Sequence, residues 1–391
     1  MPSFLWSRAL VYAVALFASL RLGADESANA ARFDHAAHTH PLGGLGDVLL
    51  SPLARWDAVW YLRIADDGYT GGADTAFFPL YPLLVRALVF PFASEGALLV
   101  SAYVVSLGCF AGALWLLQRL VALELGRPVA HATVWLVALF PAALYFGAPY
   151  SESLFLLVSV GAFYAARTGR WAWAGTLAAL ATATRSAGVV LVVPLALMWL
   201  ESRPRPRRGV LAIALAPLGL AAYALYLGVE HGDALAFVDA QEVWHRDFAG
   251  PFVGVWDGAV AAWDGIRQLA SGSRETVYFE AAAGDPFRVA AMNVLLFGFL
   301  VFAVVAAVGA LRRLPRAYGA YAVAALALPL SYPVGPQPLM SLPRFLSVLF
   351  PLFVWLAVVS EERGRTLHVA SASAVGLGLF TAQFAAWEWI A

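Results

Sequence analysis

Apolar segments recur along the whole chain, separated from one another by polar stretches. Eleven of them are long enough to cross a bilayer, or nearly so, and they are the predicted membrane-spanning helices. They lie at about 4–23, 97–120, 129–147, 151–166, 171–184, 188–200, 209–229, 289–311, 317–333, 344–359 and 366–387. Helices satisfy their own backbone hydrogen bonds in lipid. The pattern therefore predicts an all-α polytopic membrane protein, with residues 1–391 forming one transmembrane domain.

Three apolar segments need an interpretation of their own. The stretch 171–200 is long for one helix, and Arg185 interrupts it midway, so the pattern favours two short helices that meet at Arg185. Residues 77–92 are apolar but short and contain three prolines, which favours an interfacial or re-entrant segment. The first segment lacks the small-residue cleavage pattern of a signal peptide, so we expect it to remain as a span.

The charge distribution gives this topology an orientation. With the amino terminus in the cytoplasm, the inside segments hold fourteen of the 25 arginines and four of the 25 acidic residues. Short arginine-rich loops stay in the cytoplasm, so the asymmetry supports this orientation. Two large polar regions, at about 24–96 and 230–288, are then expected on the extracytoplasmic side.

Composition excludes several classes of function. Hydrophobic residues make up 61% of the chain and charged residues 13%, whereas soluble chains have roughly a quarter of their residues charged. A net charge of zero argues against a nucleic-acid partner. The single cysteine, Cys109, lies in an apolar segment, which excludes internal disulfides and cysteine metal sites. His35, His38 and His40 form a cluster that can bind a metal, but a polar loop carrying histidines is the favoured interpretation, and no metal or cofactor is expected.

The first polar region contains a carboxylate where an apolar residue is expected. Ser51-Pro52 is typical of a helix start. In a helix beginning there, Asp57 falls on the apolar face, which it shares with Leu53, Trp60, Tyr61 and Ile64. A carboxylate in that position requires a partner, an aqueous cavity or a raised pKa. The alternative is an interfacial amphipathic helix with an aromatic belt.

Four further places on the predicted outer side break the local pattern. They are Glu152 in a tight turn between two spans, Arg185 at the break within apolar sequence, the loop segment with Gln241, Trp244 and Arg246, and Arg344 at the start of a span. Three of them have a structural alternative: a helix cap for Glu152, a polar loop helix for the loop segment, and a topological exception for Arg344. For Arg185 we favour a functional role, because an arginine within the membrane is costly and usually faces a cavity or a partner.

Together these residues suit group transfer from a lipid phosphate. A carboxylate such as Asp57 can take the proton of an acceptor hydroxyl. Arginines can hold a phosphate and the charge that develops on it as it leaves. The sequence contains no Walker loop, nucleotide fingerprint or zinc motif. An activated donor on the outer side would therefore have to arrive attached to lipid.

At these positions the chain resembles the PIG-V family, the GPI mannosyltransferase 2 type within the GT-C integral-membrane glycosyltransferases. The resemblance covers nearly the whole chain and is carried by Trp56-Asp57, Gly68-Tyr69, Phe78-Pro79-Leu80-Tyr81-Pro82, Pro149-Tyr150-Ser151-Glu152-Ser153, Thr184-Arg185-Ser186 and Pro343-Arg344-Phe345. It implies a GT-C-like fold and an inverting, metal-independent transferase that uses a polyprenyl- or dolichyl-phosphate mannose. It also places the family's essential acidic residue of the first outer loop at Asp57.

The sequence thus gives a set of candidate site residues. The candidate catalytic residues are Asp57 and Glu152. The candidate substrate-binding residues are Trp56, Tyr61, Tyr69, Tyr81, Arg185, Gln241, Trp244, Arg246 and Arg344. The expected partners are a polyprenyl-phosphate sugar, a glycan or glycolipid acceptor and membrane lipid, with the active site on the outer side of the cell membrane.

The sequence departs from the family pattern in two ways, and two alternative functions stay open. The chain is short for the eukaryotic enzyme, and its first loop carries the histidine segment 35–40. A prokaryotic homologue would have no GPI precursor to modify, so the acceptor does not carry over from the family. The same fold can transfer another lipid-phosphate-linked sugar. A transporter or flippase would instead bind its substrate at mid-membrane between paired broken helices, but the sequence shows no such pair, and its candidate residues lie towards the outer surface.

Overall fold

The computed structural model describes residues 2–22, 28–91, 94–278, 285–388 and 390. In this part of the chain every regular element is an α-helix or a 3₁₀-helix, which confirms the predicted all-α class. Residues 24–27, 92–93 and 279–284, at the edges of the two predicted polar regions, lie outside the described residues.

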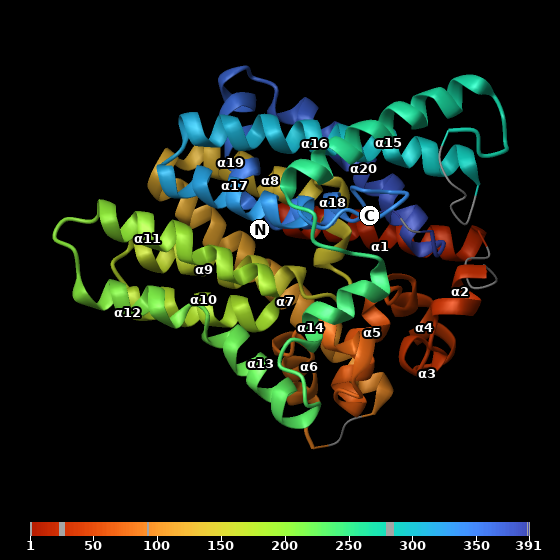
Figure 1. The fold of residues 1–391 in the computed structure, drawn as a ribbon, viewed down its shortest axis with the longest axis horizontal. Coiled ribbons are helices and arrows are strands. Elements are labelled where there is room, and N and C mark those ends of the chain that lie inside the picture. Colours follow the sequence, from red (N-terminus) through yellow and green to blue (C-terminus); the bar gives the residue numbers. More distant parts are fainter. Residues whose placement is uncertain (1, 23–27, 92–93, 279–284, 389, 391) are drawn as a thin grey trace.

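The first polar region folds into short helices between two long ones. The long helices are α1 (Pro2–Leu22) and α7 (Glu95–Leu125). Between them lie α2 (Ala28–Phe33), α3 (Ala36–Thr39), α4 (Gly44–Leu50), η2 (Ser51–Leu53), α5 (Asp57–Asp67), η3 (Gly72–Ala76) and α6 (Leu80–Val89). These short helices gather at the lower right of the molecule in Figure 1.

The central part of the chain is a series of apolar helices. In order they are α8 (Arg127–Leu139), η4 (Pro141–Phe146), α9 (Glu152–Arg167), α10 (Trp171–Thr184), η5 (Ser186–Leu191), α11 (Val192–Glu201), α12 (Arg207–Leu215) and α13 (Leu218–Glu230). Helix α9 packs against both α7 and α10, and α9 to α12 lie side by side in Figure 1.

The last part contains the second polar region and the carboxyl-terminal helices. The polar region holds α14 (Ala236–Asp239), η6 (Ala240–Trp244) and α15 (Pro251–Ser271). After it come α16 (Pro286–Arg313), α17 (Arg316–Leu330), α18 (Leu342–Ser347), α19 (Phe350–Glu362) and α20 (Thr366–Ala385). The 21-residue helix α15 has no counterpart among the predicted spans.

By length and composition, five helices of the described chain are able to cross a membrane. They are Pro2–Arg21, Glu95–Leu125, Gly209–Glu230, Pro286–Arg313 and Thr366–Ala385. These helices identify an integral membrane protein. The other six predicted spans coincide with shorter helices (α8, α9, α10, α11, α17 and α19), so the count of eleven stays a prediction.

The interruption at Arg185 is confirmed. Helix α10 ends at Thr184, Arg185 is extended with φ −157° and ψ 143°, and η5 begins at Ser186. The chain then turns back on α10 so closely that a Cβ on Gly188 would lie 2.4 Å from the backbone carbon of Ala181. Only glycine fits there, and the turn leaves the Arg185 side chain at the end of two helices.

The predicted start of the helix around Asp57 is wrong, although Asp57 still shares one helix face with Trp60, Tyr61 and Ile64. Ser51–Leu53 form a separate 3₁₀ turn, Trp56 adopts a left-handed φ of 57°, and α5 begins at Asp57. Asp57 is therefore the first residue of a helix and not the middle of an apolar face. The buried hydroxyl of Tyr150 stabilises the break, because it accepts from the Asp57 N–H (3.1 Å) and donates to the Arg55 carbonyl (2.8 Å).

Candidate active site

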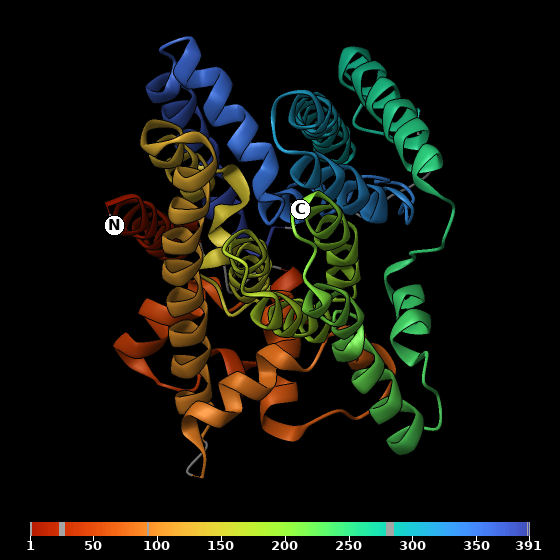
Figure 2. The ribbon, with the colours of Figure 1, turned by 90° about the vertical axis from the view of Figure 1, so that its left-hand side faces the viewer.

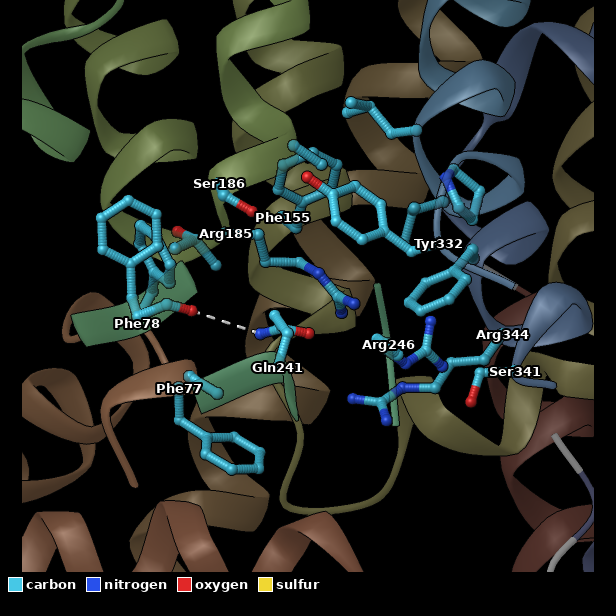
Figure 3. A pocket seen from close by; sticks show the side chains of 18 of the residues that line it. Phe77, Phe78, Phe155, Arg185, Ser186, Gln241, Arg246, Tyr332, Ser341 and Arg344 are labelled. Carbon is cyan, nitrogen blue, oxygen red and sulfur yellow. Dashed lines mark hydrogen bonds between the residues drawn. The ribbon is translucent and has the colours of Figure 1, made fainter. Parts of the chain in front are cut away.

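A cavity of about 400 Å³ lies where four distant parts of the chain meet. Its walls come mainly from the first polar region, the α10–η5 break, the loop around η6, and the segment from α17 to α18, with single residues added by α9 and α13. Seven of the predicted site residues line it: Asp57, Tyr61, Arg185, Gln241, Trp244, Arg246 and Arg344. Figure 3 shows the Arg185 side chain extending towards Arg246 and Arg344, with Gln241 below it and Phe77 at the far side of the view from Arg344. The rest of the lining is largely apolar.

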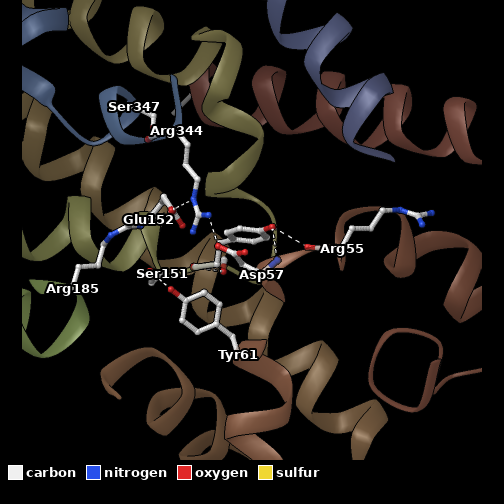
Figure 4. Close-up of polar contacts among 10 residues, drawn as sticks. Arg55, Asp57, Tyr61, Ser151, Glu152, Arg185, Arg344 and Ser347 are labelled. Atoms are coloured by element: carbon white, nitrogen blue, oxygen red, sulfur yellow. Dashed lines mark hydrogen bonds and ion pairs between the residues drawn. The ribbon is translucent and has the colours of Figure 1, made fainter. Parts of the chain in front are cut away.

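Arg344 bridges the two predicted catalytic carboxylates. Its Nη1 donates to Oδ2 of Asp57, and its Nε donates to Oε1 of Glu152. Arg185 also reaches Glu152, with Nη1 2.5 Å from the same Oε1. Figure 4 shows the Arg344 guanidinium between the two carboxylates, whereas the side chain of Arg55 points away from them. The four side chains form one connected network of charges.

Burial makes this network energetically demanding. Glu152 has no exposed surface, and Arg344 is 5% exposed. A buried charge that loses its partner typically costs about 3–5 kcal/mol, so each member depends on the others. Glu152 itself does not line the cavity; it lies behind Arg185 and Arg344 and orients both.

Helix ends support both carboxylates. Asp57 is the first residue of α5, and Glu152 is the first residue of α9. The positive end of a helix dipole stabilises an ionised carboxylate in this position. The prediction of a helix start at Glu152 is consistent with this geometry, but the side chain binds arginines instead of capping its own helix.

Strained backbone accompanies three of the charged residues. Trp56 precedes Asp57 with φ 57°, His245 precedes Arg246 with φ 53°, and Ser341 lies three residues before Arg344 with φ 68°. Left-handed conformations are uncommon for residues other than glycine, and such strain concentrates at functional sites.

Arg246 adds a third cation to the cavity. Its Nη2 donates to the Met340 carbonyl at 3.3 Å. Burial, and then the nearby guanidinium of Arg344, lower the pKa of Arg246 to about 10, so the group stays charged at neutral pH. Within the described residues no carboxylate forms an ion pair with Arg246. Three guanidinium groups thus face two carboxylates, and this excess of positive charge favours an anionic ligand.

Tyr61 lies beneath the carboxylates as a neutral hydrogen-bonding group. Its hydroxyl shares a hydrogen bond of 2.7 Å with the hydroxyl of Ser151. Burial, followed by the charge of Glu152, raises the pKa of Tyr61 to about 12. Tyr61 therefore remains protonated at neutral pH and is able to donate a hydrogen bond.

Three predicted substrate-binding residues do not line the cavity. The ring of Trp56 packs against Trp387 with centroids 5.5 Å apart. The hydroxyl of Tyr69 donates to the Phe77 carbonyl at 2.6 Å, and that of Tyr81 donates to a backbone carbonyl of α7 at 3.0 Å. In this structure Tyr69 makes a contact within the first polar region, whereas Trp56 and Tyr81 fix that region to other parts of the fold.

Sequence reasoning did not single out two aromatic residues that contact the arginines. The ring of Phe345 lies 5.6 Å from the Arg185 guanidinium and 5.5 Å from that of Arg246. The ring of Tyr150 lies 4.7 Å from the Arg344 guanidinium. Both residues belong to the motifs that carried the family resemblance, so their presence there was the available signal.

The histidine segment lies apart from the cavity lining. Nδ1 of His35 and Nδ1 of His38 are 2.8 Å apart, and Nε2 of His38 lies 3.3 Å from Asp66. Nε2 of His40 is 3.2 Å from Asp34. Among the described residues no group of three or more metal-ligating side chains is placed to hold an ion.

Comparison with known proteins places the sequence in a family. The profile of the family described as "Mannosyltransferase (PIG-V)" matches residues 3–201, which is just over half of the chain. The chain is 36% identical over 177 residues to the GPI alpha-1,6-mannosyltransferase 2 of Cricetulus griseus, covering 43% of this chain and 36% of the relative. It is 31% identical over 240 residues to the GPI mannosyltransferase 2 of Chaetomium globosum, covering 52% and 50%. The matched region is thus no more than half of either relative.

Two solved structures show a weaker likeness. An oligosaccharyltransferase of Archaeoglobus fulgidus matches with a TM-score of 0.45 and 14% identity over 85% of this chain and 48% of that one. ArnT from Cupriavidus metallidurans, solved with undecaprenyl phosphate, matches with a TM-score of 0.37 and 16% identity over 83% and 71%. Because both scores are low, the assignment rests on the sequence matches. The chain belongs to the PIG-V mannosyltransferase family.

Proposed function

We propose that this protein transfers mannose from a polyprenyl-phosphate mannose to a hydroxyl group of a glycan or glycolipid on the extracytoplasmic side of the membrane. The observation that carries the proposal is the convergence of Asp57, Arg185, Arg246 and Arg344 in one cavity. One carboxylate and three cations match a reaction in which a hydroxyl loses a proton and a phosphate leaves as an anion.

The reaction is a single displacement at the anomeric carbon. The acceptor oxygen forms a bond to C1 of the mannose while its proton passes to the Asp57 carboxylate. The bond between C1 and the phosphate oxygen breaks, and its electron pair leaves with the polyprenyl phosphate. A direct attack from the opposite face inverts the configuration at C1, in agreement with the inverting mechanism expected from the family resemblance.

The arginines hold the donor phosphate and stabilise it as the leaving group. A guanidinium is planar and can bind two phosphate oxygens at once. Arg246, which has no carboxylate ion pair among the described residues, offers the first contact. Arg185 and Arg344 can add further contacts from their positions beside Glu152. In this scheme Glu152 orients the two arginines and does not exchange protons with the substrates.

The remainder of the cavity suits a lipid-linked donor. Phe155, Val189, Leu328 and Val348 give part of its lining an apolar character. An isoprenoid chain next to the phosphate can be buried against such side chains, with roughly 0.8 kcal/mol gained per buried methylene group. This combination of cations and apolar lining favours a lipid phosphate over a soluble nucleotide sugar.

The test uses the purified protein in sealed vesicles with radiolabelled polyprenyl-phosphate mannose and extracted membrane glycolipids and glycans as acceptors. We expect label in an acceptor together with an equal amount of free polyprenyl phosphate. If label is transferred only from a donor that carries another sugar, the protein transfers that sugar and not mannose. Label that crosses the bilayer still attached to its intact donor would instead identify a transporter.

A further inference from the structure

Helix α15 has a packing face made of small residues. Gly254, Gly258, Ala262 and Gly265 are buried along one side of it. A Cβ on Gly254 would lie 2.0 Å from the carbonyl oxygen of Leu330 at the end of α17, and one on Gly265 would lie 2.7 Å from the carbonyl oxygen of Ala290 in α16. Small residues allow helix backbones to approach this closely, as they do between helices in membranes. The helix is therefore fixed against α16 and α17.

The opposite face of α15 carries large exposed apolar side chains. Phe252 is 88% exposed, Trp256 70% and Trp263 60%. Their spacings of four and seven residues place them on one side of the helix, together with Val260 and Ile266. We call these five residues the α15 stripe. Three exposed aromatic rings in a row are unusual for a surface in contact with water.

The surroundings of the α15 stripe are continuous with those of a membrane-crossing helix. Helix α16 is one of the helices long and apolar enough to span a bilayer. Its outward residues include Leu295, Val301 and Val304, each more than 40% exposed. Helices α15 and α16 pack along one another, and Figures 1 and 2 both place α15 at the periphery beside α16. The same medium therefore faces both helices.

The charged residues of α15 lie on the flank of the stripe or near its carboxyl-terminal end. Asp257 and Asp264 fall on the flank of the helix, by their position in the helical repeat. Arg267, near the carboxyl-terminal end, lies 3.3 Å from Asp264 and stacks on Tyr278 at 4.0 Å. An arginine at the end of an apolar helix can reach the headgroup level while its stem stays in apolar surroundings.

We propose that the α15 stripe is embedded in the acyl chains of the lipid bilayer, so that part of the predicted extracytoplasmic region 230–288 is a membrane-inserted helix. The occupant of this surface is lipid and not a protein partner, because the stripe continues the apolar outer surface of α16.

Membrane insertion of α15 bears on the active site, because the helix directly follows the segment that carries Arg246. The N–H groups of Ala249 and Gly250 donate to the Ser331 carbonyl at 2.8 and 3.3 Å. The ring of Phe248 lies 5.5 Å from that of Tyr332, which lines the cavity. Lipid around α15 therefore holds this segment at the level of the bilayer, where the lipid-linked donor of the proposed function would bind.

The test measures the accessibility of nitroxide labels in the protein reconstituted in phospholipid bilayers. Cys109 is first replaced by alanine, and single cysteines at positions 252, 256, 260 and 263 are labelled one at a time. Position 304 on α16 serves as the control for lipid, and position 274, where Arg274 is 81% exposed at its side chain, serves as the control for water. Oxygen concentrates in lipid, whereas a nickel chelate stays in water.

We expect the stripe positions to behave like position 304, with relaxation by oxygen several-fold stronger than relaxation by the nickel chelate. Behaviour like position 274 would overturn the proposal, because the stripe would then face water. Low accessibility to both reagents would also overturn it and would indicate a protein partner. Four separate positions keep the test decisive if one labelled variant fails to fold, and none of them depends on catalysis.

Discussion

Arg344 donates directly to the carboxylate of Asp57, although the two residues are 287 positions apart in the sequence. The candidate base is thus already bound to a cation that we propose for the donor phosphate. When the phosphate binds, it competes with Asp57 for the Arg344 guanidinium. Donor binding would then release Asp57 to accept a proton, which couples the arrival of the donor to the activation of the base.

Replacement of Arg344 tests its role in phosphate binding. Arg344→Ala should weaken donor binding by about 1.5–3 kcal/mol, the usual value of a charge-assisted contact, which is roughly 10- to 150-fold in the donor KM. Arg344→Lys should also be impaired, because lysine cannot bridge Asp57 and Glu152 with a planar group. Arg274→Ala, at an exposed site, is the matched control. Full activity of Arg344→Ala at limiting donor would make Arg344 purely structural.

Replacement of Glu152 separates positioning from catalysis. Glu152→Gln leaves Arg185 and Arg344 without their shared carboxylate, so the melting temperature should fall and the donor KM should rise. Transfer at saturating donor should persist with an unchanged pH profile, because Asp57 remains. Complete loss of transfer at saturating donor, in protein that is still folded, would instead give Glu152 a direct role in the reaction.

The pH dependence of donor binding tests Arg246. A cation whose pKa is lowered to about 10 keeps its charge at neutral pH and loses it as the pH rises through 10. Binding of the donor phosphate should therefore weaken as the pH approaches and passes 10. Lysine starts from a reference pKa of about 10.4, and the same burial and neighbouring cations should lower it further. In Arg246→Lys the rise of donor KM should therefore begin at a lower pH. An identical profile in both proteins would remove Arg246 from the binding of phosphate.

Labelling of introduced cysteines tests the predicted orientation. In a Cys109→Ala background, a cysteine at Arg274 should react with a membrane-impermeant reagent added outside, whereas one at Ser202 should react only after the membrane is opened. The expectation follows from the excess of arginines in the predicted cytoplasmic segments. Labelling of position 202 alone in intact cells would reverse the orientation and with it the side on which the cavity opens.

Much of the cavity could be predicted from the sequence, because a charged residue within an apolar segment can be recognised from the sequence alone. Asp57, Arg185 and Arg344 were found in this way, and all three line the cavity. The predicted start of the helix at Ser51 was wrong, since the left-handed Trp56 depends on the Tyr150 hydroxyl, which accepts a hydrogen bond from the Asp57 N–H across 93 positions. Local periodicity contains no information on such distant partners.

The lack of information on distant partners in a local sequence pattern also explains the other differences between the prediction and the structure. Tyr69 and Tyr81 belong to the family motif, but their hydroxyl groups bind backbone carbonyls within the fold, and a motif does not reveal which side chains face a cavity. Sequence reasoning did not single out helix α15 because Asp257, Asp264 and Arg267 lower its average apolar character, although the two aspartates lie on the flank of the exposed stripe and Arg267 lies near its carboxyl-terminal end. The position of each residue around the helix decides its environment, and an average over the segment loses that information.

The central claim is that Asp57 is the catalytic base, and the rate of mannose transfer by purified Asp57→Asn protein tests it most directly. Asparagine keeps the size of the side chain and still accepts a hydrogen bond from Arg344, so the protein should fold, but it cannot take up the acceptor proton. Loss of a general base costs a factor of about 10²–10⁴. Asp67→Asn, at the exposed last residue of the same helix, should transfer at the wild-type rate. A fall of that size in Asp57→Asn alone is the predicted result, and transfer by Asp57→Asn at the wild-type rate would contradict the account.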